Sequence, residues 1–474
     1  MSIEDAINRE GNPVAERSRP NILVFLTDDH GQWAAGCYGN RALHTPSMDW
    51  LALTGARCEN AFTPCPVCSP ARASFWTGQF PSAHGVHDHL GNRDHPGITG
   101  QTNLAERLQT EGYRTGLSGK WHGHATGAQR QPGFDYWFSQ WGGTNAKFGN
   151  QPFSENGERR EFYGHQAPIV TDAAIRFLRE SRDDAPFFLF VGYTETHSPF
   201  STLPERLAAP HRADCFDDVP REGFSGCHGR PKTAAPDDEA AWREQLVQYY
   251  AAVEALDEQI GRILDELEAT GQLHNTLIVY TSDHGHMNGQ HGLLCKGNAT
   301  VPQNFIEESI RIPMLLRQPD LVREGTEVNE PVDHCDLHAT LLASAGAKAN
   351  SSAPGKSLLP LLKGEEVVWR DFQLGEYGNA RMIRTSLGEK LIKRWPGPNG
   401  QFRDEFYDLK SDPRETTNRI DDPEWQARIA ELSEKLDSEF AQLERPGCSG
   451  IEAVFRDLFN PQEPWKQVVN PTAS

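Results

Sequence analysis

Short apolar runs alternate with longer amphipathic stretches through most of the chain. The runs at 21–26, 186–191 and 276–280 are almost continuously apolar, as expected of strands buried on both faces, and 113–118 also predicts a strand. Apolar residues recur three or four positions apart over 102–111 and 242–270, which predicts helices that end at Gly112 and Gly271. This alternation indicates an α/β fold with a mostly parallel central sheet and helices on both faces.

The pattern changes after about residue 364. Residues 382–385 and 390–394 alternate around Gly388, which predicts a hairpin, and helical spacing returns over 423–443. We therefore expect a flexible lead-in at 1–19, a catalytic α/β domain at 20–364, a smaller C-terminal α+β domain with an antiparallel sheet at 365–445, and a tail at 446–474. Segment 211–240, rich in Pro, Gly and acidic residues, predicts a surface loop or lid.

Composition and charge exclude several classes of protein. The 474 residues include 46 Lys and Arg against 66 Asp and Glu, a formal charge of −20, which makes nucleic acid a poor partner. An anionic substrate therefore requires a locally positive site. There is no apolar run of membrane-spanning length and no apolar core of a secretory signal in the first 20 residues, so we expect no membrane partner and a cytoplasmic location. The nine cysteines are odd in number and scattered, unlike a dense disulfide framework.

Acidic residues follow two of the predicted strands. Asp28 and Asp29 come after the first apolar run, and Asp283 with His284 comes after 276–280. Because parallel strands place their carboxyl ends at one sheet edge, these carboxylates should meet there, where they repel one another unless a cation neutralises them. Oxygen ligands with one imidazole suit a divalent ion. The alternative for each single Asp is a loop-forming or helix-capping role.

Basic residues follow the same strand ends. Lys120 and His122 come after 113–118, His197 comes after 186–191, and Lys296 lies beyond Asp283. Each of them alone is compatible with a solvated side chain. Four converging on one edge supply the local positive charge with which an acidic protein can hold an anion.

A candidate nucleophile lies in the segment from Cys65 to Gly78. Pro70 favours the first turn of a helix, which places Cys68 beside free backbone N–H groups, with Arg72 one turn further on. Such a position suits a nucleophile that attacks an anionic ester. Two alternatives remain: Cys65 and Cys68 form a redox-active or zinc-binding C-x-x-C, or Cys68 is a buried structural cysteine. A phosphate-binding loop ending at Lys120 is excluded, because the glycine spacing is wrong and Trp121 follows the lysine.

The stretch Cys68-Ser-Pro-Ala-Arg72, followed by Thr77-Gly78, is similar to the C-x-P-x-R-x-x-x-x-T-G motif of the type I sulfatases. The other segments follow in the family's order, including Gly119-Lys-Trp-His122, His197-Ser-Pro199 and Ser282-Asp-His-Gly285. The resemblance covers roughly 20–440. It implies an alkaline-phosphatase-like fold and hydrolysis of a sulfate ester, either a sulfated carbohydrate, small or oligomeric, or an aryl sulfate.

The resemblance also implies a modified nucleophile and a metal. A formylglycine-generating maturation enzyme would oxidise Cys68 to formylglycine, an aldehyde whose hydrate attacks sulfur. The expected metal is Ca²⁺, with Mg²⁺ or Mn²⁺ as alternatives. The resemblance assigns as its ligands Asp28, Asp29, the hydrated residue 68, Asp283 and His284.

The remaining roles are likewise implied by the resemblance. Arg72 and Lys120 would hold the hydrate and the developing negative charge. His197 or Lys296 would protonate the leaving alcohol, and His122 would accept the proton whose loss expels sulfate. The chain departs from the family pattern at His124 and Thr196, which leaves its substrate specificity open.

Two other functions remain open at this point. A relative in the same superfamily that hydrolyses phosphonate monoesters or phosphodiesters would use a similar nucleophile and metal set. A protein with this fold and an unmodified Cys68 would bind anions or glycans without turnover. His84, His87 and His89, which lie beyond the nucleophile segment, either line the same pocket or are surface histidines.

Overall fold

A computed structural model describes residues 19–91, 95–124, 127–142, 147–181, 185–200, 203–348, 353–398 and 400–455. Its largest sheet within these ranges has ten strands in the order β15-β2-β14-β10-β1-β8-β4-β5-β6-β7. The strands at its centre run parallel to one another. They are β10 (Thr276–Ser282), β1 (Asn21–Thr27), β8 (Phe187–Gly192), β4 (Arg114–Gly119) and β5 (Tyr136–Gln140). The predicted strands are therefore confirmed.

The edges of this sheet are mixed. On one side β14 (Met314–Arg317) runs antiparallel to both β10 and β2 (Ala56–Cys58), and β15 (Thr326–Val328) is parallel to β2. On the other side β6 (Phe148–Glu155) and β7 (Glu158–His165) form an antiparallel hairpin. The parallel arrangement thus holds at the centre, where the site lies.

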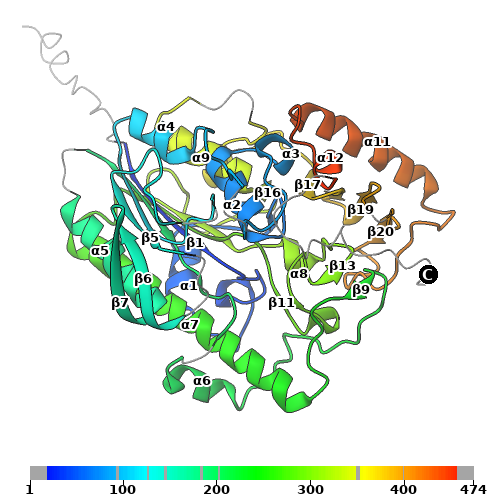
Figure 1. Ribbon diagram of the computed structural model, residues 1–474, viewed down its shortest axis with the longest axis horizontal. Coiled ribbons are helices and arrows are strands. Elements are labelled where there is room, and N and C mark those ends of the chain that lie inside the picture. Colours follow the sequence, from blue (N-terminus) through cyan, green and yellow to red (C-terminus); the bar gives the residue numbers. More distant parts are fainter. Residues whose placement is uncertain are drawn as a thin grey trace, which may run out of the picture.

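Helices cover both faces of the sheet (Figure 1). One face is covered by α1 (Pro46–Leu53), α5 (Gln166–Glu180) and α7 (Glu239–Ala269). The other face is covered by α2 (Cys68–Thr77), α4 (Leu104–Thr110) and α9 (His334–Ser344). Strand β1 contributes to both cores, because Leu23 and Phe25 face the first and Val24 and Leu26 the second. This is why residues 22–26 of the strand are all apolar.

Helix ends differ from the sequence prediction by a few residues. Helix α7 begins three residues earlier than expected, because the Asp238 side chain accepts the Ala241 amide as an N-cap. Helix α4 begins after a capping box formed by Asn103 and Glu106, and Gly112 beyond its end adopts a φ of 84°. In both helices the local cap fixes the boundary.

The C-terminal region contains a separate antiparallel sheet of β17 (Phe372–Tyr377), β18 (Ala380–Thr385), β19 (Glu389–Arg394) and β20 (Glu405–Asp408). The predicted hairpin around Gly388 is the β18–β19 pair. Helix α11 (Gln426–Leu443) packs on this sheet through Leu432, Leu436 and Phe440. In Figure 1 this region lies beside the carboxyl-end side of the large sheet, while the domain boundaries drawn from the sequence stay predictions.

The remaining elements are short. Segment 211–240 is largely exposed, yet Phe216, Val219 and His228 anchor it in the protein. The short elements are η2 (Gly36–Tyr38), β3 (Ala61–Phe62), α3 (Pro81–His84), α6 (Glu205–His211), β9 (Arg230–Pro231), β11 (Met287–Asn288), η3 (Gln290–Gly292), β12 (Leu294–Cys295), β13 (Thr300–Val301), α8 (Glu307–Ile310), β16 (Val332–Asp333), α10 (Leu359–Leu362) and α12 (Gly450–Ala453).

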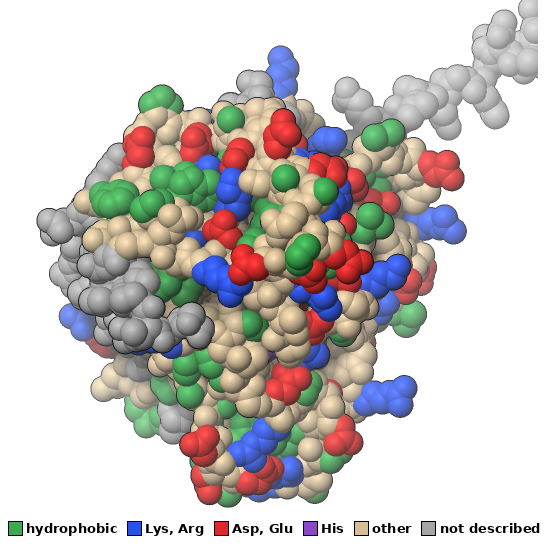
Figure 2. Space-filling model, turned by 90° about the vertical axis from the view of Figure 1, so that its right-hand side faces the viewer, with side chains coloured by type: hydrophobic (Ala, Val, Ile, Leu, Met, Phe, Trp, Pro, Cys, Tyr) green, Lys and Arg blue, Asp and Glu red, His purple; other side chains and the backbone are tan. Residues whose placement is uncertain are grey.

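The surface carries both signs of charge. Figure 2 shows acidic and basic side chains interspersed over the face that carries the C-terminal region, with no continuous basic area on it. Among the described residues, no helix combines the length and the apolar character needed to span a bilayer.

Candidate active site

The ends of four adjacent parallel strands carry the residues that the sequence singled out. Because β10, β1, β8 and β4 are neighbours in the sheet, the segments that follow them meet at one edge. These segments hold Asp283 and His284 after β10, Asp28 and Asp29 after β1, His197 after β8, and Lys120 and His122 after β4. Cys68 and Arg72 come from α2, and Lys296 from the loop after β12.

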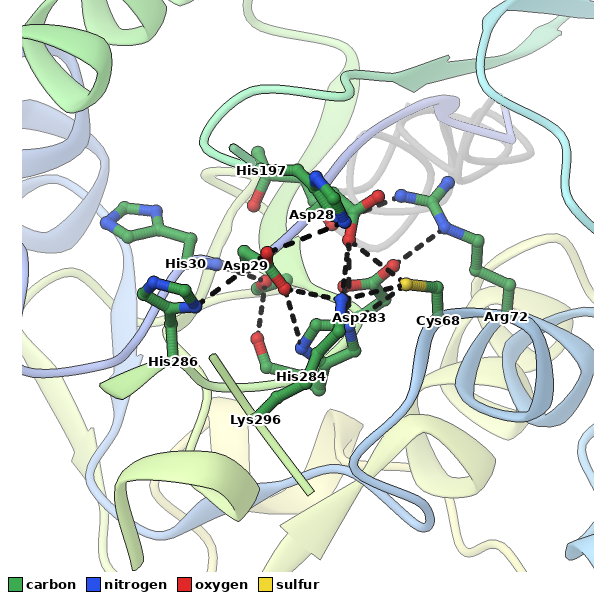
Figure 3. Close-up of polar contacts among 12 residues, drawn as sticks. Asp28, Asp29, His30, Cys68, Arg72, His197, Asp283, His284, His286 and Lys296 are labelled. Atoms are coloured by element: carbon green, nitrogen blue, oxygen red, sulfur yellow. Dashed lines mark hydrogen bonds and ion pairs between the residues drawn. The ribbon is translucent and has the colours of Figure 1, made fainter. Parts of the chain in front are cut away.

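Cys68 lies beside Asp28 and Asp283, on the same side of them as Arg72 (Figure 3). It is the first residue of α2, after an extended Val67, as the position of Pro70 predicts. Its Sγ lies 3.0 Å from Nζ of Lys296, 3.3 Å from Nε2 of His284 and 3.4 Å from Oδ1 of Asp28. The thiol is therefore enclosed by a cation, an imidazole and a carboxylate.

Arg72 and Asp283 form a buried ion pair beside the thiol. Nε of Arg72 lies 2.8 Å from Oδ2 of Asp283, and both side chains are fully buried. The other guanidinium nitrogens donate to the carbonyls of Lys120 and Thr27, at 3.1 and 3.3 Å. The second carboxylate oxygen of Asp283 has no hydrogen-bond partner among the residues that the structure describes, although Nε2 of His284 lies 3.2 Å away.

Two lysines hold the other carboxylates ionised. Nζ of Lys120 contacts Oδ2 of Asp28, and Nζ of Lys296 lies 2.6 Å from Oδ1 of Asp29. Burial alone would raise the pKa of Asp28, but the charges of Lys120 and Lys296 outweigh it and hold this pKa well below its usual range. Lys296 and His197 lower the pKa of Asp29 in the same way. Both groups are therefore anionic at neutral pH.

The donor set fits a divalent cation. Ligand atoms of Asp28, Cys68, Asp283 and His284 all lie within 4.8 Å of one another, and these side chains are buried. The unpartnered oxygen of Asp283 is the kind of buried acceptor that an ion would satisfy. Asp29, the fifth predicted ligand, belongs to an overlapping group with Asp28 and His197. Carboxylate and imidazole donors of this kind suit Ca²⁺, Mg²⁺ or Mn²⁺.

The two candidate proton-transfer histidines contact different residues of the site. Nε2 of His122 lies 3.0 Å from Oγ of Ser69 on α2, and His122 has a left-handed φ of 56°. Nε2 of His197 lies 3.8 Å from Oδ2 of Asp29, and its side chain is 22% exposed, in contrast to the buried Lys296. Burial lowers the pKa of both histidines.

The three histidines after α2 have different surroundings. His84 and His87 are buried, and their Nε2 atoms lie 3.1 Å from Oγ of Ser74 and 2.6 Å from the carbonyl of Cys448. Both histidines have structural roles, so they neither line the active-site pocket nor lie on the surface, the two alternatives that the sequence left open. His89 is exposed, and its ring stacks edge-on to that of His122 at 4.9 Å, so it lies next to the site.

The structure places two further residues against the site: Thr196, which the sequence marked only as a departure from the family pattern, and His286, which sequence reasoning missed. Oγ1 of Thr196 donates to the carbonyls of Asp28 and Asp29 at 3.3 and 2.9 Å, which fixes a turn in which Asp29 has a φ of 60°. His286 is buried, with Nδ1 3.7 Å from Oδ2 of Asp29, and burial lowers its pKa to about 4. Its position two residues after His284 was the available signal.

Comparison with known proteins agrees with this geometry. A family model described as "Sulfatase" matches residues 20–347, and one described as "N-sulphoglucosamine sulphohydrolase, C-terminal" matches 302–442. The chain belongs to the sulfatase family. It is therefore a sulfuric ester hydrolase of the alkaline phosphatase superfamily, as the motif around Cys68 predicted.

Two relatives with names that specify a carbohydrate match most of this sulfatase, and others are named as an arylsulfatase and a choline-sulfatase. It is 30% identical to an ulvan-active sulfatase of Formosa agariphila, over 94% of this chain and 84% of that protein. It is 28% identical to an N-acetylglucosamine-6-O-sulfatase of Bacteroides thetaiotaomicron, over 90% of this chain and 87% of the relative.

Solved structures share the fold. One, in complex with its substrate D-glucosamine-2-N,6-O-disulfate, matches with a TM-score of 0.78 and 26% identity, over 90% of this chain and 98% of that chain. The phosphonate monoester hydrolase of Agrobacterium radiobacter matches with a TM-score of 0.73 over 90% of this chain and 96% of its own. At 23% identity, this second likeness concerns the fold alone.

Proposed function

We propose that this sulfatase hydrolyses the sulfate ester of a sulfated carbohydrate, with residue 68 as formylglycine and Ca²⁺ as the resident metal. The observation that carries the proposal is the position of Cys68, whose Sγ has Lys296, His284 and Asp28 within 3.4 Å. The sulfur marks the place of a nucleophile at the N-terminus of α2. The likeness to two sulfatases of sulfated sugars supports the choice of substrate.

The net reaction consumes one water. The S–O bond of R–O–SO₃⁻ breaks, the alcohol R–OH leaves, and sulfate and one proton are released. Formylglycine would supply an oxygen nucleophile from which sulfate can afterwards be expelled, and the divalent cation would stabilise negative charge on that oxygen and on the sulfate. Asp28, Asp29, Asp283 and His284 would hold the cation together with residue 68.

The chain's own cations bind the anionic ester. Nζ of Lys120 and Nζ of Lys296 approach different carboxylate oxygens of Asp28, and Arg72 is held between Asp283 and three backbone carbonyls. Because these groups are fixed in a buried site, they stabilise charge on the sulfate oxygens without reorganising. This is the locally positive site that an acidic protein needs for an anionic substrate.

Proton transfer is assigned by position. His197 is on the more open side of the site and would protonate the leaving alcohol, while Lys296, at 3.0 Å from Sγ of Cys68, would stay with the nucleophile. His122, next to Ser69 at the start of α2, would accept the proton whose loss releases sulfate. Its neutral imidazole suits that role, because burial lowers its pKa.

Peptide mass spectrometry across 58–72 tests the nucleophile. The protein is produced in its own host or together with a formylglycine-generating enzyme, and a known sulfatase is matured in parallel. We expect the mass of the aldehyde or its hydrate at Cys68. An intact thiol there, with the control converted, would contradict the proposal and favour a binding protein or direct chemistry at the cysteine.

Matched substrates test the reaction on converted protein. We expect kcat/KM for a carbohydrate sulfate to exceed that for an aryl phosphonate monoester. A preference for the phosphonate would instead support hydrolysis of phosphonate monoesters, the alternative reaction, which a protein with the same fold carries in its name.

A further inference from the structure

A cavity of about 600 Å³ lies beside the catalytic group. It is lined by Ser198, Phe200, Thr233, Glu244, Gln245, Gln248, His286, Leu294 and Cys295. Three of these residues connect it to the site: Ser198 follows His197, Cys295 precedes Lys296, and Nδ1 of His286 lies 3.7 Å from Oδ2 of Asp29. Its volume is in the usual range for a small-molecule site.

His286 is an unsatisfied polar group in the wall of this cavity. Its side chain is 5% exposed, and neither ring nitrogen has a hydrogen-bond partner among the described residues. Its ring stacks on Tyr249 at 5.2 Å, which fixes the plane of the imidazole. Figure 3 shows His286 on the Asp29 side of the cluster, away from Arg72. Buried polar atoms of this kind normally have a partner, and a bound hydroxyl group would supply one.

The rest of the wall is suited to a neutral, hydroxyl-rich ring. Gln245 and Gln248 of α7 contribute amides, Ser198 and Thr233 contribute hydroxyls, and Phe200 contributes an aromatic ring. Apolar contact combined with a few fixed hydrogen-bonding groups is typical of small-molecule sites. A sugar ring offers the matching apolar face and hydroxyl groups.

The charges of the wall oppose a second anion. No Lys or Arg is among the described residues that line the cavity, and its one carboxylate, Glu244, is paired with Arg212 and accepts a hydrogen bond from Nε2 of Gln248 at 2.8 Å. The sulfate position beside Cys68, by contrast, has Lys120, Lys296 and Arg72 around it. A further sulfate or carboxylate on the ring would lose hydration in the cavity without gaining a cationic partner.

We propose that this cavity receives the sugar ring that carries the scissile sulfate and selects rings with no further anionic group. The inference rests on the proposed function and narrows its substrate class to sugar units that are neutral apart from the sulfate to be removed. His286 and the two glutamines would orient the ring through its hydroxyl groups.

Binding to the full-length Cys68→Ala protein tests this selectivity without turnover. Isothermal titration calorimetry in the presence of Ca²⁺ uses matched pairs: N-acetylglucosamine 6-sulfate against glucosamine 2-N,6-O-disulfate, and galactose 6-sulfate against galactose 2,6-disulfate. We expect the monosulfated member of at least one pair to bind about tenfold more tightly than its partner. Equal or tighter binding of the disulfated members, or no binding by any sugar, would overturn the inference.

A charge insertion makes the test specific to the cavity. In the Cys68→Ala background, Gln245→Lys should shift the affinity ratio toward the disulfated sugar by about tenfold, because it supplies the missing cation at a position whose amide contacts the neutral Asn288. Gln442→Lys adds the same charge on an exposed part of α11 and should leave the ratio unchanged. His286→Gln should weaken binding of the monosulfated sugar. An unchanged ratio in Gln245→Lys, with the melting temperature preserved, would place the sugar elsewhere.

Turnover separates this inference from the proposed function. If converted wild-type protein hydrolyses 4-nitrophenyl sulfate and both members of each sugar pair equally well, the selectivity is wrong and the sulfatase mechanism stands. If converted protein hydrolyses no sulfate ester, the proposed function fails and the inference fails with it.

Discussion

Nε of Arg72 and Oδ2 of Asp283 lie 2.8 Å apart in a fully buried ion pair, while within the described part of the chain the other oxygen of Asp283 has no hydrogen-bond partner. The same carboxylate thus fixes the guanidinium and leaves one oxygen for an ion. This relationship ties the metal site to the anion-binding arginine, because loss of either partner leaves an unpaired buried charge.

Asp283 is expected to be required for metal binding. Asp283→Asn preserves the shape of the side chain but removes its charge, so Ca²⁺ affinity measured by calorimetry should fall strongly and turnover should be lost. Asp283→Ala should also abolish both and in addition destabilise the fold by about 3–5 kcal/mol, because Arg72 is left buried without a counter-charge. Asp320→Asn, at an exposed position, is the matched control. Full activity of Asp283→Ala would contradict the metal assignment.

Cys68 and Cys65 are expected to behave differently. Both are buried free thiols, three residues apart, but only Cys68 has Lys296 and His284 within 3.3 Å of its sulfur. Cys68→Ala should abolish hydrolysis of 4-nitrophenyl sulfate, whereas Cys65→Ala should retain kcat and lose some thermal stability, because it leaves a small core cavity. If both variants lose kcat while remaining folded, the result would support the alternative that Cys65 and Cys68 form a redox-active or metal-binding C-x-x-C.

The sequence was sufficient for the centre of the fold and for most of the site. Strand ends are easily located when a continuous apolar run stops at Asp28 or Asp283, and Pro70 marks the start of α2. The hairpin of β6 and β7 was not predicted, because it contains Pro152, Gly149 and many exposed charged residues, a pattern that does not alternate clearly.

His286 and Thr196 show a different limit. Their roles depend on which backbone carbonyl or carboxylate lies opposite after folding, and that information is not local to either residue. Thr196 meets Asp29 only because β8 and β1 are neighbours, and His286 meets Asp29 only because β10 is the other neighbour of β1. Strand order, which single-residue patterns do not encode, decides both contacts.

The leaving-group acid is expected to be His197 rather than Lys296. His197→Asn should lower kcat for a sugar sulfate by about 10²-fold or more, with a much smaller effect on 4-nitrophenyl sulfate, whose acidic phenol leaves without protonation. Lys296→Met should slow both substrates to a similar extent, because Nζ of Lys296 lies 3.0 Å from the nucleophile. If Lys296→Met gives the selective loss instead, the two roles are exchanged.

The free energy of unfolding is expected to fall at alkaline pH, because the folded protein holds a proton on the buried His228 that the unfolded chain loses. His228, in segment 211–240, is 1% exposed, and its Nδ1 lies 3.3 Å from Oε2 of Glu405 on β20 and 3.1 Å from the hydroxyl of Tyr407. Burial alone would lower the pKa of His228, but hydrogen bonds with Cys227 and Glu405 outweigh it and raise this pKa to about 10. The charged pair therefore anchors the segment to the C-terminal sheet.

The raised pKa fixes the direction of the pH effect. In the unfolded chain His228 loses its proton near its ordinary value of about 6.5, whereas the folded protein keeps it up to about 10. Between these values the folded state binds the extra proton, so the free energy of unfolding decreases as pH rises through this window and the full contribution is present below it. Thermal unfolding measured from pH 6 to pH 10 should show a falling melting temperature, and the fall should be shallower in His228→Gln. His44→Gln, which removes an exposed histidine, should follow the wild-type slope. An unchanged slope in folded His228→Gln would mean that other groups carry the alkaline destabilisation.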